Sequence, residues 1–502
     1  MGKLLKCLPK IYLNREATMK FIVKLFPEIT IKSRPVRKRF IQRLQNNLQI
    51  VMRRLDDDIR VSLFWDKLEV VLPEEKLEHR AAVCKVMAQA PGIQTFIEVE
   101  EYPLGTFHEA FEHTLQAYRE RLVGQTFKVR VKRSGKHEFK SIDLERYIGG
   151  GLLEHADTNG VDVRNPQLYV DLEVRDQKLF VFNKIHKGLG GYPLGTQEPV
   201  LSLISGGFDS VVSSYMTMRR GAKTHFLFFN LGGKAHQMGV EQVALHLWQE
   251  YGSCARVKFI SVPFDEVIGD ILQNVHHSYM GVVLKRQMMR AAEKVADFMK
   301  IDALVTGESI AQVSSQTIPN LAVIDRATTK VVIRPLITTD KQEIVDQTKA
   351  LGCFDLVASI PEYCGVISDR PTTRAKLEKV EAEELNLDMS IIDRALEQTR
   401  TSKIDDIVKN LQAQQQIETL SKVSSMQKIV DIRAPHEQEK KPLNMPGCEI
   451  LLTPFYELDT QIQHWSDEYE YLLYCEKGIM SQLHAQSLQE KGLLNVKVFR
   501  PE

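Results

Sequence analysis

The segment Leu201–Met216, LSLISGGFDSVVSSYM, places a glycine turn between an apolar run and a helical pattern. Such a turn lets successive backbone amides face one anion, and the N-terminus of the following helix adds further N–H donors. The segment is not a Walker A motif, because no lysine precedes Ser210. A turn without this lysine suits a departing pyrophosphate better than transfer of a γ-phosphoryl group. We therefore predict attack at the α-phosphorus of a nucleotide, with the acceptor becoming an adenylate.

Polar side chains within the turn extend the predicted phosphate site. Ser205 and Ser210 supply hydroxyl donors beside Gly206 and Gly207. A carboxylate does not attract bare phosphate, so we expect Asp209 to hold Mg²⁺, directly or through water. A glycine turn that only packs a strand tightly against a helix is the alternative interpretation of the same residues.

A second turn follows another apolar strand in ALVTGESIAQVSSQT. Gly307 ends this strand, and Glu308, Gln312 and Gln316 follow it, so these groups are candidates to contact the base or sugar of a nucleotide. An ordinary strand-to-helix turn would look the same. Lys285, in the helical stretch GVVLKRQMMRAAEKVA, is a candidate to neutralise phosphate charge, although a cation at a solvated helix end is the commoner explanation.

Two of the seven cysteines stand out by their setting. Cys475 ends an apolar strand in YEYLLYCEKGIMSQLHAQSL and precedes a helix, where backbone N–H groups stabilise a sulfur anion. Cys364 lies in the Pro/Gly loop SIPEYCGVISDRPTT, which we expect at the mouth of a parallel sheet. Both residues are also compatible with a buried structural role. The chain has no C-x-x-C motif or His/Cys cluster along the sequence, so we expect no zinc site.

Basic residues are concentrated in the N-terminal part of the chain, although the formal net charge is only +1. The stretch VRVKRSGKHEFKSIDLERYIGGGL places Lys132, Arg133, Lys136 and His137 near one turn, with Phe139 beside them. Cations contact RNA phosphates and aromatic rings stack on bases, so this turn is a predicted RNA-binding site. Solvated loop charges would produce the same pattern.

The elements around these residues place the glycine turns at the edge of a parallel sheet. From Val200 the apolar strands VLSLIS, THFLFFN, RVKFISV and DALVTG alternate with helical stretches, which is typical of βαβ units. Ligands of such sheets bind at the carboxyl ends of the strands, where both glycine turns lie. An α+β pattern precedes Val200, and a second short α/β pattern follows a polar stretch near Asp405.

The chain of 502 residues is long enough for about two to four domains, and we predict a multidomain protein of α+β and α/β class. We interpret residues 1–18 as a leader, because Met19 opens a clean strand pattern. No window approaches the roughly 18 apolar residues of a membrane span, so we expect no membrane partner. Scattered cysteines fit a reducing cytoplasm.

Taken together, these residues resemble the bacterial tRNA 4-thiouridine synthase (tRNA sulfurtransferase) family, in its long form, from Met19 to Glu502. The resemblance is carried by MKFIVKLFPEITIKS, RVKRSGKHEFKSIDLERYIGGGL, LSLISGGFDS, LVTGESIAQVSSQT, IPEYCGVIS and YCEKGIMS. It implies the following organisation: a ferredoxin-like domain (19–75), a tRNA-binding THUMP domain (76–183), a Rossmann-like PP-loop domain of the adenine nucleotide α-hydrolase type (184–404), a linker (405–425) and a rhodanese-like domain (426–502).

The resemblance also implies a reaction and its participants. ATP with Mg²⁺ adenylates O4 of the uridine at position eight of tRNA, and a cysteine desulfurase loads sulfur as a persulfide onto Cys475. The persulfide delivers its sulfur, after which Cys364 and Cys475 form a transient disulfide. Similar proteins also pass sulfur to a carrier protein for the thiazole of thiamine. The sequence is compatible with a homodimer and with a monomer. The implied ATP contacts are Leu203, Ile204, Ser205, Gly206, Gly207, Ser210, Lys285, Gly307 and Gln316.

Rival functions explain parts of the sequence less well. Another pyrophosphate-releasing enzyme, such as an amidotransferase-type synthetase or a lysidine synthase, would not need the basic N-terminal half and the terminal cysteine loop. A non-catalytic RNA-binding or sulfur-carrier protein would not need an intact loop with its glycines, serines and Asp209.

Overall fold

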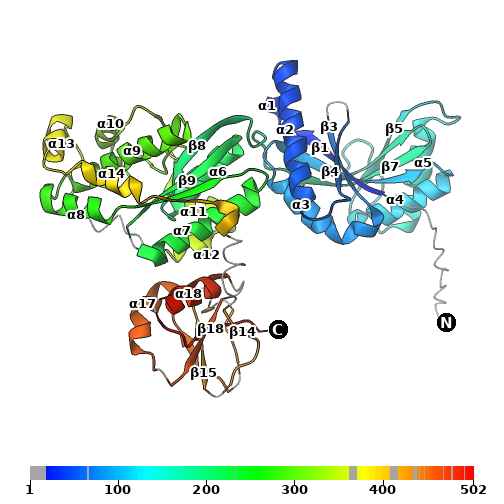
Figure 1. Ribbon diagram of the computed structural model, residues 1–502. Coiled ribbons are helices and arrows are strands. Elements are labelled where there is room, and N and C mark those ends of the chain that lie inside the picture. The colour runs from blue at the N-terminus through cyan, green and yellow to red at the C-terminus, as the bar shows by residue number, and fades with distance from the viewer. Residues whose placement is uncertain are drawn as a thin grey trace. The chain divides into compact units, whose positions relative to one another are not determined.

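The chain is described by a computed structural model (Figure 1). The described residues are 18–64, 67–231, 233–360, 370–407, 417–424, 426–433, 438–439, 441–445, 447–466, 468–475, 479–490 and 492–501. By internal packing the chain divides into two units, Met1–Thr196 and Gln197–Glu502. Among the described helices, none has the length and apolar composition needed to cross a membrane.

The N-terminal unit is built on one mixed sheet of seven strands in the order β2-β3-β1-β4-β7-β6-β5, in which only β5 and β6 pair parallel. The strands are β1 (Thr18–Leu25), β2 (Arg60–Phe64), β3 (Lys67–Leu72), β4 (Ile93–Pro103), β5 (Phe127–Ser134), β6 (Leu168–Arg175) and β7 (Lys178–Lys187). The helices are α1 (Pro27–Thr30), α2 (Arg34–Met52), η1 (Glu74–His79), α3 (Arg80–Gln89), α4 (Phe107–Leu122) and α5 (Ser141–His155).

Local sequence explains where the longer helices of this unit begin and which face they bury. Helix α2 has a proline in its first turn, and Leu44, Leu48 and Met52 recur at helical spacing on its buried face. Helix α4 begins with a capping box, in which Thr106 and Glu109 satisfy each other's backbone N–H groups. These helices therefore present apolar stripes to the sheet.

Two large hydrophobic cores of the described residues share this one sheet, and a small third cluster gathers Ile97, Val99 and Phe180. One core gathers β1, β2, β3, α2 and α3 and takes in Ile93 and Phe96 of β4, whereas Tyr102 near the end of β4 belongs to the second core, with α4 and α5. Strand β4 therefore contributes side chains to both cores, the first part of the strand to one and the last part to the other. The boundary predicted between residues 75 and 76 falls inside η1, and the following helix α3 packs with the first core.

The second unit begins with a six-stranded sheet in the order β12-β11-β8-β9-β10-β13, parallel except for the edge strand β13. The strands are β8 (Gln197–Leu203), β9 (Ala222–Asn230), β10 (Lys258–Pro263), β11 (Ala303–Val305), β12 (Val331–Ile333) and β13 (Arg400–Lys403). The four strands expected from the alternating pattern are confirmed as β8 to β11. The short strands β12 and β13 complete the two edges.

Helices pack in two groups around this sheet. One group gathers α6, α7, α11 and α12, and the other gathers α8, α9, α10, α13 and α14. The helices are α6 (Phe208–Arg219), α7 (Gly233–Leu247), η2 (Trp248–Gly252), α8 (Asp265–Asn274), α9 (Met280–Met299), η3 (Ser314–Gln316), α10 (Ile318–Asp325), α11 (Lys341–Ala350), α12 (Phe354–Ala358), α13 (Leu377–Glu384) and α14 (Ser390–Glu397).

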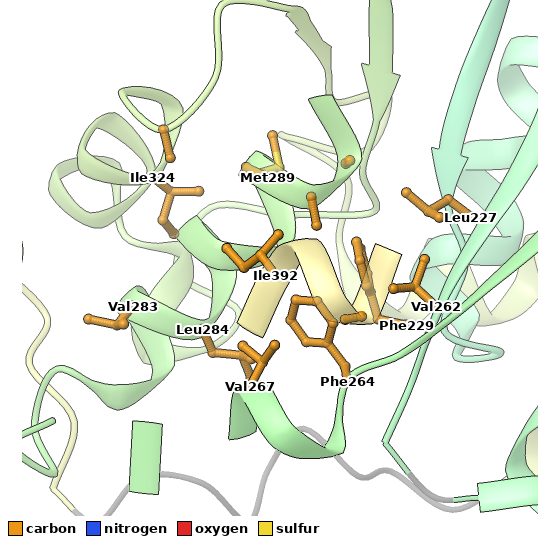
Figure 2. Packing of buried hydrophobic residues seen from close by; sticks show 14 of the residues in the cluster. Leu227, Phe229, Val262, Phe264, Val267, Val283, Leu284, Met289, Ile324 and Ile392 are labelled. Carbon is orange, nitrogen blue, oxygen red and sulfur yellow. The ribbon is translucent and has the colours of Figure 1, made fainter. Parts of the chain in front are cut away.

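The second helix group buries the largest apolar cluster of the described chain (Figure 2). Phe264 lies beside Val267 and Phe229 in this cluster, where the end of β10 turns into α8, and Leu284 of α9 packs there as well. Burying one such side chain completely contributes about 1.5–3 kcal/mol to the stability of the fold. The cluster fixes α9, and with it Lys285, against the sheet.

The C-terminal part of the chain forms a separate parallel sheet of five strands in the order β14-β18-β17-β15-β16. Its strands are β14 (Thr419–Leu420), β15 (Gln427–Asp431), β16 (Ile450–Leu452), β17 (Glu470–Tyr474) and β18 (Val496–Phe499). Its helices are η5 (Phe455–Glu457), α17 (Leu458–Gln461), η6 (Ile462–His464) and α18 (Ile479–Glu490). Strand β14 lies inside the segment 405–425 expected as a linker, so this sheet begins earlier than the sequence predicted.

Candidate active site

The glycine turn connects β8 to α6 as the sequence predicted. Strand β8 ends at Leu203, and Ile204 extends its pairing by donating to Leu227 O at 2.9 Å. Gly206 then adopts φ +83°, a conformation that favours glycine, and Gly207 is the N-cap of α6. A Cβ on Gly206 would lie 2.7 Å from Ile360 Cδ1, so space also requires glycine. The first-turn N–H groups of α6 have no partner within the helix, which leaves them available to an anion.

Hydroxyl groups tie the turn to its helix. The Ser210 hydroxyl donates to Gly207 O at 2.9 Å and accepts from Ser205 N at 3.2 Å. Ser214 donates to Ser210 O and shares a 2.8 Å hydrogen bond with Ser202 of β8, so small polar side chains let α6 approach the strand closely. Ser205 itself is exposed at the mouth of the turn. The turn is thus held in shape before any ligand arrives.

Asp209 is held by two side chains from distant segments. Lys341 Nζ, at the first residue of α11, lies 2.9 and 3.1 Å from the two carboxylate oxygens, and Gln312 Nε2 donates to Oδ2 at 2.7 Å. Lys341 is separated from Asp209 by 132 residues, so the sequence did not indicate it. The turn therefore lacks a Walker lysine in sequence but has a lysine beside it in space.

Gly307 forms the closest packing contact with the turn. A Cβ built on Gly307 would lie 2.5 Å from the Asp209 carbonyl carbon and 2.7 Å from Ser210 N. Both atoms belong to the backbone and cannot rotate away. Absence of a side chain at this position therefore lets the end of β11 touch the first turn of α6.

Replacing Gly307 with alanine should displace the first turn of α6 and raise KM for ATP at least about tenfold, because a 1 Å misplacement alone can cost about 100-fold in rate. Steady-state pyrophosphate release at varied ATP measures this. Gly269→Ala on α8 is the matched control, since no atom lies within 4 Å of a Cβ there. Equal KM values for the two variants would contradict the proposed contact.

Glu308 connects the second glycine turn to two cations. Its Oε1 accepts from Lys285 Nζ at 2.8 Å, and its Oε2 accepts from Arg334 Nε at 2.7 Å. The residue is buried, yet these cations outweigh desolvation and lower the pKa of Glu308 to about 2. Arg334 also pairs with Asp325. Lys285, predicted as a phosphate contact, is therefore oriented by an ionised carboxylate next to Gly307.

The side chain of Gln316 supports the loop after β11. Gln316 is buried, and its Oε1 accepts a hydrogen bond from Ser309 N at 3.3 Å. Its backbone oxygen accepts from Ala311 N at 3.0 Å, where Ala311 adopts φ +61°. The predicted ATP contacts around Gly307 thus form one packed loop beside the glycine turn.

Cys475 lies where β17 leads into α18. The Ser481 backbone N–H, in the first turn of α18, donates to Cys475 Sγ at 3.3 Å, and the Ser481 hydroxyl lies 3.5 Å from the same sulfur. The sulfur is buried and receives donors that favour negative charge. On the neighbouring strand β15, the last residue Asp431 pairs with Tyr474 of β17 and forms a buried ion pair with Arg433.

Two other described cysteines, Cys84 and Cys353, have thiols with a raised pKa. Burial raises the pKa of Cys353 to about 12. Burial and the neighbouring Glu98 carboxylate raise the pKa of Cys84 to about 12 as well. A thiol with such a pKa is a poor nucleophile at neutral pH. Cys364 lies outside the described residues.

The predicted RNA-binding turn joins β5 to α5. Lys132, Arg133 and Lys136 are exposed there. His137 holds the turn in place, since its ring nitrogens lie 2.6 Å from Asp176 O and 3.2 Å from Arg133. The Phe139 ring lies 5.4 Å from the His137 ring, which places aromatic surface beside the cations. Charge and ring surface thus occur together in this turn.

Two family models match the chain. The model described as "Thiamine biosynthesis protein (ThiI)" matches residues 195–389, and the THUMP domain model matches residues 105–183. A tRNA sulfurtransferase of Tolumonas auensis is 48% identical over 483 residues, covering 96% of this chain and 100% of that protein. A tRNA sulfurtransferase of Pseudomonas putida is 49% identical over the same coverage. The chain belongs to the tRNA sulfurtransferase family.

A solved structure of a 4-thiouridine synthetase in complex with RNA and bound ATP matches the chain with a TM-score of 0.67. The two proteins are 27% identical, and the match covers 77% of this chain and 99% of that one. The glycine turn and Gly307 lie within the residues matched by the ThiI model, and Lys132 to His137 lie within the THUMP match. The resemblance inferred from the motifs is confirmed.

Proposed function

We propose that this member of the tRNA sulfurtransferase family adenylates the uridine at position eight of tRNA and replaces its O4 with sulfur from a persulfide on Cys475. The observation that carries the proposal is the turn at Gly206, closed by Gly307 and flanked by Lys285 and Lys341. The ATP and RNA bound by the structural neighbour support it.

The first step uses the glycine turn. O4 of the uridine attacks the α-phosphorus of ATP, the bond to the bridging oxygen breaks, and pyrophosphate leaves with the electron pair. The backbone N–H groups of Gly207 and of the first turn of α6 hold the pyrophosphate, and Lys285 and Lys341 balance its charge. The ATP contacts follow the sequence prediction: Leu203, Ile204, Ser205, Gly206, Gly207, Ser210, Lys285, Gly307 and Gln316.

Magnesium fits this site through Asp209. The Asp209 side chain is 23% exposed, and oxygen ligands of this kind suit Mg²⁺. When bound, the ion would neutralise charge on the phosphates. Asp209 would hold it, while Gln312 keeps the carboxylate oriented.

The second step uses the sulfur atoms. The terminal sulfur of the Cys475 persulfide attacks C4 of the adenylated uridine, a C–S bond forms, and AMP leaves with the former O4. The Cys364 thiolate then attacks the Cys475 sulfur, which releases 4-thiouridine and forms the Cys364–Cys475 disulfide. A two-electron reductant reopens the disulfide. The N–H and O–H of Ser481 support charge on the Cys475 sulfur.

Partners follow from these steps. A cysteine desulfurase would supply the sulfur, and tRNA is the acceptor. The five-stranded parallel sheet that carries Cys475 is proposed as a rhodanese-like domain. A second acceptor, the sulfur-carrier protein for the thiazole of thiamine, is favoured by the description of the matching family model. We place the reaction in the cytoplasm, with a homodimer as a further proposal.

The activity is tested by mixing the full chain with tRNA, ATP, Mg²⁺, a cysteine desulfurase and cysteine, and measuring 4-thiouridine and pyrophosphate. We expect both products, in equal amounts, and neither without ATP. Omission of the desulfurase should remove 4-thiouridine and leave the first-turnover burst of pyrophosphate. A preparation that releases no pyrophosphate with tRNA present would overturn the proposal.

Replacing Lys132 and Lys136 together with alanine should weaken tRNA binding and lower the salt slope of log Kd by about 1 to 2, because each lost phosphate contact removes about one released counterion. Titrations of tRNA at several salt concentrations measure this. The matched control is Lys294→Ala with Lys349→Ala, two exposed cations that pair with carboxylates on helices of the second unit. An unchanged slope would remove this turn from the interface.

A further inference from the structure

The N-terminal unit contains a cluster of potential metal ligands that the proposed reaction does not use. Cys84 lies on α3, Glu98 on β4 and His186 on β7, so three elements of the first core bring them together. Glu98 is 1% exposed, an unusual environment for a carboxylate. The cluster offers one sulfur, one oxygen and one nitrogen donor, and all three atoms lie within 4.8 Å of one another.

The donor atoms are close to the spacing that a tetrahedral ion requires. Bonds of about 2.0–2.3 Å to zinc place neighbouring donors roughly 3.3–3.7 Å apart. Cys84 Sγ lies 3.6 Å from Glu98 Oε1, which already matches. His186 Nε2 lies 2.5 Å from the same oxygen, so this pair must open by about 0.8–1.2 Å when an ion binds.

Neighbouring residues orient two of the three ligands. Arg80 donates to Glu98 Oε2 from Nε at 3.1 Å and from a terminal nitrogen at 2.6 Å, which leaves Oε1 directed toward Cys84 and His186. The Phe96 ring stacks on the His186 ring at 4.7 Å between centroids. Contacts of this kind fix ligand orientation in metalloproteins.

We propose that Cys84, Glu98 and His186 bind one Zn²⁺ in the N-terminal unit. A thiolate, a carboxylate and an imidazole form a donor set that zinc accepts, and the two negative ligands balance the charge of the ion. Binding releases the thiol proton of Cys84 and moves the imidazole proton of His186 to Nδ1, which frees Nε2. A solvent molecule takes the fourth position, since the His186 side chain is 20% exposed.

The ion would act as a clamp within the N-terminal unit. It ties α3 to the two neighbouring strands β4 and β7, at the part of the sheet where the first core ends. The proposal departs from the sequence expectation of no zinc site, because Cys84 and His186 are 14 and 88 residues from Glu98 and form no short motif. The Cys84 thiol and the His186 ring contact Glu98 directly, so the ion would replace two existing hydrogen bonds. The experiment below therefore detects the bound metal itself.

The experiment uses the full chain, reduced and freed of metal with a chelator, and Co²⁺ as the spectroscopic probe. We expect one equivalent of Co²⁺ to produce a thiolate-to-cobalt charge-transfer band and the strong visible bands of tetrahedral coordination, both bleached by Zn²⁺. Cys84→Ala should lose the charge-transfer band. Cys254→Ala and Cys475→Ala should keep it, because neither residue belongs to the cluster.

A second measurement protects the test against misfolding of the Cys84 variant. His186→Gln should unfold at the wild-type temperature in chelator but lack the rise in melting temperature that Zn²⁺ gives the wild type. No cobalt band in the wild type, a band that survives Cys84→Ala, or an equal zinc-dependent rise in His186→Gln would each overturn the proposal. Formation of 4-thiouridine is measured separately, so failure of the metal site leaves the proposed reaction standing.

Discussion

Replacing Cys475 with alanine should abolish 4-thiouridine formation, with a loss of at least about 1,000-fold, while ATP-dependent pyrophosphate release in the first turnover continues. The variant lacks the sulfur that carries the persulfide, but the glycine turn is built from other residues. Transfer of ³⁵S from labelled cysteine through the desulfurase measures the first effect. Release of labelled pyrophosphate in a single turnover measures the second.

The matched control for Cys475 is Cys353→Ala. Cys353 is also buried, but its pKa is raised to about 12 and its sulfur contacts only the Thr348 carbonyl among the hydrogen-bond partners found for it. This variant should keep both activities if it folds, which circular dichroism checks. Wild-type rates of 4-thiouridine formation in the Cys475 variant would assign the persulfide to a different residue.

Replacing Asp209 with alanine should lower the rate of pyrophosphate release by about 100- to 1,000-fold, and formation of 4-thiouridine should fall with it. The substitution removes the proposed magnesium ligand, and it also frees Lys341 and Gln312 from the carboxylate that positions them. Persulfide formation on Cys475 should be unchanged, because that step needs no nucleotide. Pre-steady-state release of pyrophosphate and trapping of the persulfide measure the two effects separately.

Two further variants separate charge from position at this site. Asp209→Asn keeps a side chain that Gln312 can contact but removes the negative charge, so it should lose activity as Asp209→Ala does. Asp346→Ala removes an exposed carboxylate from α11, the helix of Lys341, and should behave as wild type. If Asp209→Ala released pyrophosphate normally, the glycine turn would not be the site of adenylation.

Sequence patterns predicted the elements that local chemistry determines. The apolar strands that became β8 to β11, the glycine turn and the junction at Cys475 all depend on residues within about ten positions of one another. Lys341 and Arg334 were missed, because their partners Asp209 and Glu308 are 132 and 26 residues away. The pairing of β12 with β11 brings Arg334 to the site, and the packing of α11 on α6 brings Lys341.

Short strands and shared sheets were the other features that the sequence concealed. β14 consists of two residues and has no apolar pattern of its own, so its pairing with β18 alone defines it. Likewise, no break in composition shows that β4 serves two cores. The cluster of Cys84, Glu98 and His186 has the same origin, since β-sheet pairing places β4 beside β7.

The division of β4 between two cores has a consequence for dissecting the protein. Strand β1 pairs with β4 from Thr18 to Leu25, so a polypeptide beginning at residue 76 would expose one whole side of β4 as an unpaired edge, with Phe96 uncovered. Such a fragment should aggregate. A fragment of residues 18–196 keeps every strand partner of this sheet and should melt in one cooperative transition, as a single folding unit with two hydrophobic centres.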